Sequence, residues 1–364
     1  MTVKLKPCAG CATEKPLREL GKGGFCSLCR ADGTSGRPKP PEQPPEVTIL
    51  HDEPSEVEMP AFPKAELDYG SPSQQELAAR TLARRRLLPF IKRFKPKYDA
   101  GWVHEDICRR LEQFMKDVEN GKEPRLLLMM PVRHGKSEIA SRHFAPFVLG
   151  HHPDWEIIAA SGAQSLAMSF SRYIRDLVRD PAYQSVFPSM KLDPNSQSVE
   201  NWSSTSGGGY LAAGIGTMIT GRGAHILVID DPVKDAEAAD SQGQRDATWE
   251  WYMSTAYTRL APGGGVLGIM TWWHDDDWAG RVQQSMATGE GDMFEIVKYP
   301  AVNDKGDEYV LPGGNIEQLP LGSSIPEGAV MTRPHNTALH PARYTLASLL
   351  RRKASYYALG QQRW

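Results

Sequence analysis

The segment LMMPVRHGKSEIAS, residues 128–141, carries the residue types of a phosphate-binding loop. Gly135, Lys136 and Ser137 match the last three positions of the pattern GxxxxGK[ST], but Met130 stands where that pattern begins with glycine. In such a loop the backbone N–H groups hold the phosphates, the lysine contacts the β and γ oxygens, and the serine hydroxyl binds Mg2+. The segment therefore predicts a site for ATP and Mg2+.

The same loop offers a second cation and further nucleotide contacts. We expect the guanidinium of Arg133 to neutralise charge on the γ-phosphate, the alternative being an arginine of a surface loop without that role. Pro131 and Gly135 can shape the loop without the missing first glycine. His134 is included among the nucleotide-binding positions without a specific role.

A carboxylate is needed to hold the metal, and the segment HILVIDDP at residues 225–232 supplies two. Asp230, at the end of an apolar strand, is the candidate for Mg2+, and Asp231 is the candidate for orienting the attacking water. Because many such sites have glutamate at the second position, Glu237 and Asp235 in the following segment stay open as alternative bases. The competing interpretation is a pair of aspartates that only caps a turn.

A third apolar segment ends at Thr271, within VLGIMTWWHDDDWAGRV at residues 266–282. A threonine at that point would lie beside the γ-phosphate and sense its hydrolysis. His274 and the aspartates at 275–277 resemble a metal-binding set, but consecutive residues of a turn point in different directions. We therefore predict that these aspartates begin a helix, whose N-terminus favours carboxylates.

Two CxxC pairs near the N-terminus form the strongest metal-binding pattern of the chain. Two disulfides would be the alternative, but a reducing cytoplasm and the spacing favour tetrahedral Zn2+. The predicted zinc ligands are Cys8, Cys11, Cys26 and Cys29.

The elements that must position these residues follow from the apolar pattern. Of the 364 residues 40% are apolar, enough for a sizeable core. Short, fully apolar strands alternate with helical segments, which predicts an α/β fold with a mainly parallel sheet covered by helices on both faces. We predict a zinc knuckle at residues 1–32, a Pro-rich acidic linker without fixed structure at 33–73, and a P-loop ATPase domain at 74–364, closed by residues 300–364.

Charge and hydropathy narrow the function classes. The net charge of -2 gives no global attraction to nucleic acid, so any DNA contact must be local. The basic residues between Arg84 and Lys97 indicate either a phosphate contact or a solvated face. Neither a membrane-spanning run nor a signal peptide is recognisable, so we expect a cytoplasmic protein without a membrane partner.

Several ordered motifs between about Arg84 and Trp364 resemble the ATPase half of the large terminase subunit of tailed bacteriophages. MPVRHGKSE is similar to the family's PPRHGKSE, and TWWHDDDWAGR to its TRWHEDDLAGR. The acidic strand is preceded by TGRG, as is common in the family, and HPARYTLASLLRRKASYYALGQQRW resembles the segment that closes the ATPase domain. The fold implied is the additional-strand, RecA-like type of P-loop NTPase.

The resemblance implies roles for individual residues. Lys136 and Ser137 would hold phosphate and Mg2+, Arg133 the γ-phosphate and Asp230 the metal, while Thr271 would couple hydrolysis to movement. His104 would lie near the nucleotide base, or would be a satisfied surface histidine. An arginine from a neighbouring subunit is also implied; the candidate is Arg222, with Arg175 and Arg259 as alternatives.

The resemblance further implies partners and a place of action. They are double-stranded DNA, the portal protein of the procapsid, a small terminase subunit and further copies of the chain in a ring, with a monomer in isolation. We expect the nuclease domain of the family to be absent from this chain. It would act in cis if this sequence is part of a longer polypeptide, or in trans if it is encoded elsewhere. The setting would be the cytoplasm of the infected bacterium, transiently at the portal vertex. The alternatives are a helicase-like protein and a zinc-containing DNA-binding adaptor.

Overall fold

The computed structural model describes residues 5–7, 14–16, 71–303, 307–310 and 330–358. The chain divides into two units, Met1–Leu67 and Asp68–Trp364. In the first unit the described residues form an antiparallel pair of short strands, β1 (Leu5–Pro7) and β2 (Glu14–Pro16). The four cysteines predicted to bind Zn2+ and residues 33–70 of the predicted linker lie outside the described residues.

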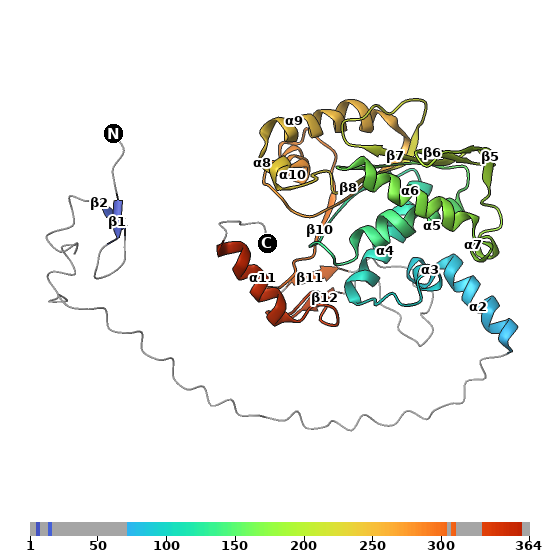
Figure 1. The fold of residues 1–364 in the computed structure, drawn as a ribbon, viewed down its shortest axis with the longest axis horizontal. Helices are drawn as coiled ribbons and strands as arrows, with labels where there is room; N and C mark the ends of the chain where they lie inside the picture. The colour runs from blue at the N-terminus through green and yellow to red at the C-terminus, as the bar shows by residue number, and fades with distance from the viewer. Residues whose placement is uncertain (1–4, 8–13, 17–70, 304–306, 311–329, 359–364) are drawn as a thin grey trace, which may run out of the picture. The chain divides into compact units, whose positions relative to one another are not determined.

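The second unit is built on one eight-stranded sheet, in the order β10-β3-β9-β8-β4-β7-β6-β5 (Figure 1). The neighbours from β10 to β7 pair in parallel, and β6 and β5 continue the sheet as antiparallel strands. This confirms the predicted α/β fold with a mainly parallel sheet. The strands are β3 (Arg125–Met129), β4 (Glu156–Ser161), β5 (Leu192–Gln197), β6 (Asn201–Ser204), β7 (Gly209–Gly214), β8 (Ala224–Asp230), β9 (Leu260–Met270) and β10 (Glu295–Lys298).

Alternate residues of the central strands face two different cores, as the two-residue period of a strand requires. In β3, Leu126 and Leu128 pack in one core and Leu127 and Met129 in the other. The first core is covered by α3 (Leu87–Phe94), α4 (Trp102–Glu119), α5 (Ala145–His151), α6 (Gln164–Arg179) and α7 (Pro181–Val186). The second is covered by α9 (Gln242–Trp251), the π-helical turn at Tyr252–Ala256 and α10 (Trp278–Thr288). Helices therefore cover both faces, as predicted.

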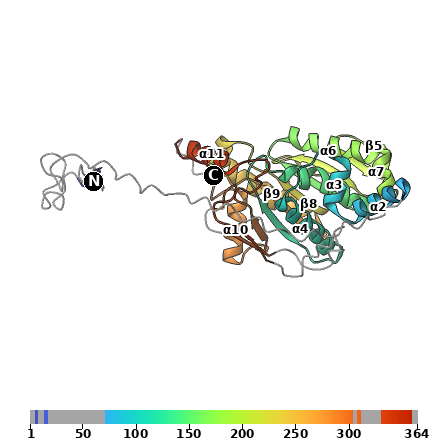
Figure 2. The ribbon, with the colours of Figure 1, turned by 90° about the horizontal axis from the view of Figure 1, so that it is seen from below.

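The second unit opens with α2 (Pro72–Arg85), which begins inside the segment assigned to the linker. Ser71 caps this helix and forms a capping box with Gln74, so the sequence SPSQ ends the preceding segment. In both views α2 lies beside α7 (Figures 1 and 2), where Arg84 Nε donates to the carbonyl of Val186 at 2.7 Å.

The basic residues of this opening segment are largely engaged within the chain. Arg86 pairs with Glu112 at 2.9 Å, and Lys95 pairs with Glu138 at 2.7 Å. Arg93 likewise reaches Glu76. Ion pairs of this kind fix α2 and α3 against the body, so these contacts favour a structural role over a phosphate contact for the paired residues.

The closing segment returns to the body near the phosphate loop. β12 (Val330–Arg333) pairs with β11 (Asp307–Val310), and α11 (Leu346–Ala358) follows. The Arg333 guanidinium donates to the carbonyls of Pro300, Ala301 and Thr337, which ties the two ends of the segment together. Among the helices that the structure describes, none is long and apolar enough to cross a membrane.

Candidate active site

The phosphate loop connects β3 to a helix that starts at Lys136. Its backbone is left-handed at Arg133 (φ 62°) and at Gly135 (φ 98°). A β-carbon at Gly135 would lie 3.0 Å from both His104 Nε2 and Tyr98 Oη, so the position needs glycine for space as well as for φ. A non-glycine residue at positive φ is uncommon and concentrates at functional sites, which fits the position of Arg133 in this loop.

Asp230, at the carboxyl end of β8, lies against the helix that follows the loop. Ser137 Oγ donates to Asp230 Oδ1 at 3.1 Å, and Ser141 Oγ donates to Asp230 Oδ2 at 2.5 Å. Burial raises the pKa of Asp230 to about 6, with the charge of Asp231 adding to the effect and the hydroxyl donors and Lys136 opposing it. Hydroxyl and carboxylate oxygens are the ligands that Mg2+ prefers, so Ser137 and Asp230 fit the predicted metal site.

Ser141 is a site residue that the motif comparison missed. It lies one helical turn after Ser137, and residues four apart in a helix share a face, so the spacing offered a signal. The helix is π-helical over Glu138–Phe144, a conformation that often marks functional sites. Ser141 is buried, and it holds the second oxygen of the carboxylate that Ser137 contacts.

Lys136, Asp231 and Thr271 form a connected set beside this pair. Lys136 Nζ lies 2.8 Å from Asp231 Oδ2 and donates to Thr271 Oγ1 at 3.1 Å. The Thr271 backbone N–H donates to Asp231 Oδ1 at 2.9 Å, so both carboxylate oxygens are engaged. The set forms because β9 lies between β3 and β8, and parallel neighbours end at the same edge of the sheet.

The backbone at Asp231 gives a reason for aspartate at a position where glutamate is common. Its φ is 42°, and aspartate is several-fold enriched in this left-handed region. Gly162 lets the turn approach β4 closely, since its N–H donates to the Asp231 carbonyl at 3.1 Å and a β-carbon there would lie 2.8 Å from that oxygen. This turn conformation directs the Asp231 side chain towards Lys136.

The two alternative bases lie on the next short helix, α8 (Ala236–Asp240). Asp235 caps this helix, because its Oδ1 accepts from the Ala238 N–H at 2.8 Å. Glu237 is exposed. Of the three candidate carboxylates, Asp231 is the one whose described contacts include Lys136.

The side chains of His134 and His104 support the phosphate loop through hydrogen bonds to its backbone carbonyls. His104 Nδ1 accepts from the Gly101 N–H, and its Nε2 lies 2.9 Å from the His134 carbonyl, to which it can donate. The His134 ring donates through Nδ1 to the Val132 carbonyl at 3.0 Å, and both rings are buried. His104 is therefore a buried support of the phosphate loop rather than a surface histidine.

This support predicts a pH dependence of stability. Burial lowers the pKa of His104 from 6.5 to about 4. Because the folded pKa lies below the unfolded one, the stabilising contribution of neutral His104 is present above about pH 6.5 and is lost as the pH falls towards about 4. We expect the wild type to lose up to about 3 kcal/mol more unfolding free energy over this window than His104→Gln, whose amide can still donate to the His134 carbonyl. Urea unfolding of both proteins at the two ends of the window measures the difference, and parallel pH profiles would contradict it.

The three aspartates at residues 275–277 directly precede α10, and the last of them is its N-cap, which confirms the predicted helix start. Asp277 caps the helix through a bond from the Gly280 N–H at 3.0 Å and also accepts from the N–H groups of Trp273 and His274. Asp276 bridges Arg281 and Arg245, and these partners lower its pKa to about 2. Over the described ranges, no group of three or more His, Cys, Asp or Glu is arranged to hold a metal ion.

The candidate arginines for a neighbouring site lie elsewhere. Arg222 precedes β8, at the opposite end of that strand from Asp230, and donates to Asn201, Ser203 and Glu156 of its own chain. The expectation that Arg222 reaches another subunit is therefore not supported by its surroundings, which fit a structural role. The alternatives are Arg175, which donates to the Gln197 carbonyl, and Arg259, which precedes β9 at the same end of the sheet as Arg222.

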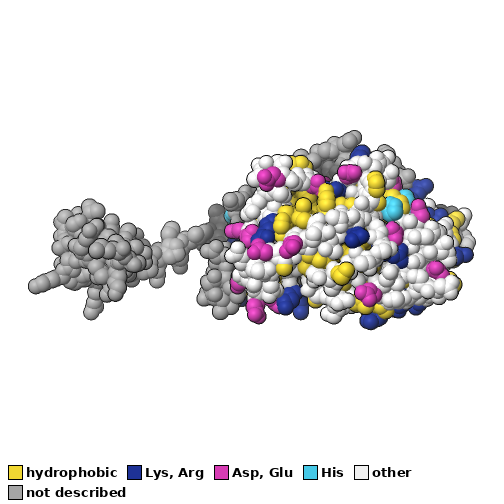
Figure 3. Space-filling model, turned by 90° about the horizontal axis from the view of Figure 1, so that it is seen from above, with side chains coloured by type: hydrophobic (Ala, Val, Ile, Leu, Met, Phe, Trp, Pro, Cys, Tyr) yellow, Lys and Arg dark blue, Asp and Glu magenta, His cyan; other side chains and the backbone are white. Residues whose placement is uncertain are grey.

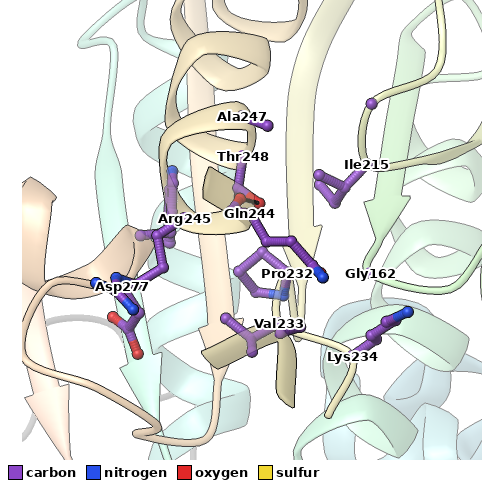
Figure 4. A pocket seen from close by; sticks show the side chains of 13 residues that line it. Gly162, Ile215, Pro232, Val233, Lys234, Gln244, Arg245, Ala247, Thr248 and Asp277 are labelled. Atoms are coloured by element: carbon purple, nitrogen blue, oxygen red, sulfur yellow. Dashed lines mark hydrogen bonds between the residues drawn. The ribbon is translucent and has the colours of Figure 1, made fainter. Parts of the chain in front are cut away.

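A pocket of about 210 Å³ opens directly beyond the Asp231 turn (Figure 4). Pro232 and Val233 line it on one side, and Gln244 and Thr248 of α9 line it on the other. The pocket gives open space next to the turn that carries the candidate base.

Comparison with known proteins bears on this site. A family model described as "Terminase large subunit, T4likevirus-type, N-terminal" matches residues 127–321. The crystal structure of the HK97 bacteriophage large terminase is similar to this chain with a TM-score of 0.39 and 13% sequence identity, and the match covers 61% of this chain and 45% of that terminase. No curated protein matches. The family match includes the phosphate loop, Asp230, Asp231 and Thr271, and it covers more than half of the 364 residues. The chain therefore belongs to the large terminase subunit family.

Proposed function

We propose that this chain is the ATP-hydrolysing motor subunit of a phage terminase and drives double-stranded DNA into a procapsid. The observation that carries the proposal is the contact of Lys136 with Asp231 and Thr271, directly beside the contact of Ser137 with Asp230. The placement of β9 between β3 and β8 supports the additional-strand type of P-loop ATPase. That arrangement gives phosphate, metal and water each a separate side chain.

The residues divide the chemistry as follows. When bound, Mg2+ at Ser137 and Asp230 would neutralise charge on the β and γ oxygens of ATP. Lys136 exchanges its ion pair with Asp231 for the phosphate oxygens, and Arg133 at the exposed tip of the loop adds a second cation. Asp231, released from Lys136, orients the attacking water and accepts its proton. Thr271 contacts Lys136 and is bonded to Asp231, so it is placed to respond to the loss of the γ-phosphate.

The wider assembly is part of the same proposal. Copies of the chain act as a ring on the portal protein in the cytoplasm of the infected cell, with a small terminase subunit as a partner and a nuclease domain in cis or in trans. An arginine from the neighbouring copy stabilises the negative charge on the transferring phosphoryl group. The zinc knuckle at Cys8, Cys11, Cys26 and Cys29 remains a prediction from the sequence.

ATP turnover by the purified full chain tests the proposal. We expect Mg2+-dependent hydrolysis that is slow in dilute solution and rises per chain with protein concentration, portal protein and duplex DNA. The adaptor alternative instead predicts DNA binding with no turnover in any assembled state. The helicase alternative predicts strand separation of a forked duplex, which a packaging motor does not need.

A further inference from the structure

The C-terminal part of the chain has an unusual charge pattern. Residues 328–364 contain six Lys or Arg and no Asp or Glu, whereas the rest of the chain has 36 basic and 44 acidic residues. Aromatic residues are interspersed with these cations, at Tyr344, Tyr356, Tyr357 and Trp364. A local basic and aromatic segment in a chain of net charge -2 is the pattern expected of a nucleic-acid contact.

Three arginines of this segment lack, among the described residues, the ion pairs that neutralise arginines such as Arg86 and Arg125. Arg86 and Arg125 are ion-paired with Glu112 and Asp292. On the face shown in Figure 3, acidic and basic side chains are likewise interspersed. Arg343, Arg351 and Arg352, which we call the α11 basic surface, are all exposed, and none of them forms an ion pair with a described residue.

Two of these cations converge on one ring. The guanidinium carbon of Arg352 lies 4.8 Å from the centre of the Tyr344 ring, and that of Arg343 lies 5.8 Å from it. Two like charges against one aromatic side chain, with no carboxylate of the described residues paired to either, are stabilised by an anion that binds both. A duplex presents a phosphate charge every ~1.7 Å along its axis, which suits several exposed cations on and beside one helix.

Tyr344 also joins this surface to the phosphate loop. Its ring centroid lies 4.9 Å from that of His134, whose Nδ1 donates to the Val132 carbonyl inside the loop. We propose that the α11 basic surface binds the phosphate backbone of duplex DNA and that Tyr344 connects the bound DNA to the nucleotide loop. The choice of duplex DNA rests on the proposed packaging function, but the binding itself requires no ATP hydrolysis.

The test measures the affinity of the full chain for a short labelled duplex by fluorescence anisotropy over a series of salt concentrations. We expect Arg351→Ala/Arg352→Ala to lower DNA affinity about tenfold and to reduce the slope of log affinity against log salt by about 2, since each phosphate contact contributes about 0.9. Arg351→Lys/Arg352→Lys keeps the charges and should keep most of the slope. Lys92→Ala/Lys97→Ala, which removes two exposed lysines of the opening segment, is the matched control and should bind as the wild type does.

The same variants separate DNA from the other source of phosphate, the nucleotide. Binding of a fluorescent ATP analogue should be unchanged in Arg351→Ala/Arg352→Ala, because Lys136 and Ser137 hold the nucleotide. Unchanged DNA affinity, or a loss confined to the ATP analogue, would overturn the proposal. Tyr344→Leu tests the connection. In the wild type, bound DNA should change the affinity for the ATP analogue. In Tyr344→Leu, DNA should still bind but should no longer change that affinity. Because none of these readouts requires turnover, an inactive ATPase would not be mistaken for a failed DNA surface.

Discussion

Lys136→Ala is expected to lower kcat for ATP hydrolysis by about 10²- to 10³-fold, the cost of removing one preorganised charge from a transition state. The Lys136 side chain is buried, and its Nζ reaches both Asp231 and Thr271, so its removal leaves these two side chains without their cation. Turnover is measured at saturating ATP and Mg2+ with portal protein and DNA present, and a thermal melt of each protein confirms that the variant is folded.

The matched control is Lys234→Ala. Lys234 lies three residues after Asp231, and its side chain is 53% exposed, so its removal subtracts the same charge without reaching the loop. We expect its kcat to stay within about twofold of the wild type, because an exposed charge is largely screened by solvent. Near-normal turnover by Lys136→Ala would show that the segment at residues 128–141 is not the nucleotide site.

Asp231→Asn should have an effect of similar size, with kcat falling by about 10²- to 10³-fold as expected for loss of a general base. Asparagine keeps an oxygen that can accept from the Thr271 N–H and tolerates the left-handed backbone at this position, so the fold should be preserved. Since Lys136 still binds phosphate, the affinity for an ATP analogue should be unchanged. Single-turnover hydrolysis together with analogue binding separates the two effects.

Glu237→Gln and Asp235→Asn decide between the possible bases. Both should hydrolyse ATP almost as the wild type does, because Glu237 is exposed and Asp235 is engaged in capping α8. If Glu237→Gln lost activity while Asp231→Asn kept it, the base would be Glu237, and Asp231 would serve only to hold Lys136. Asp231→Glu should be partly active, because glutamate is less favoured than aspartate at positive φ and its side chain is one methylene longer.

The sequence by itself determined the local parts of this protein. Apolar runs such as RLLLM and HILVID predict buried parallel strands, because only strands covered on both faces are apolar at every position. The Gly-Lys-Ser triplet predicts a strand-loop-helix turn, and Asp277 predicts the start of α10, because these residue types favour particular backbone and capping geometries within a few positions. Lys136, Ser137, Asp230, Asp231 and Thr271 could therefore be identified as candidates before any tertiary structure was considered.

The tertiary structure alone decided which of these parts meet. The place of β9 between β3 and β8 depends on packing between strands that are far apart in the chain, and that order brings Thr271 to Lys136. The same long-range packing brings Asn201 and Glu156 to Arg222 and gives His104 a loop carbonyl to contact. It also sets Tyr344 of the closing segment against His134. Local residue types fix the backbone over a few positions, but contacts across hundreds of residues depend on how the helices and strands bury their apolar faces together, which no short motif encodes.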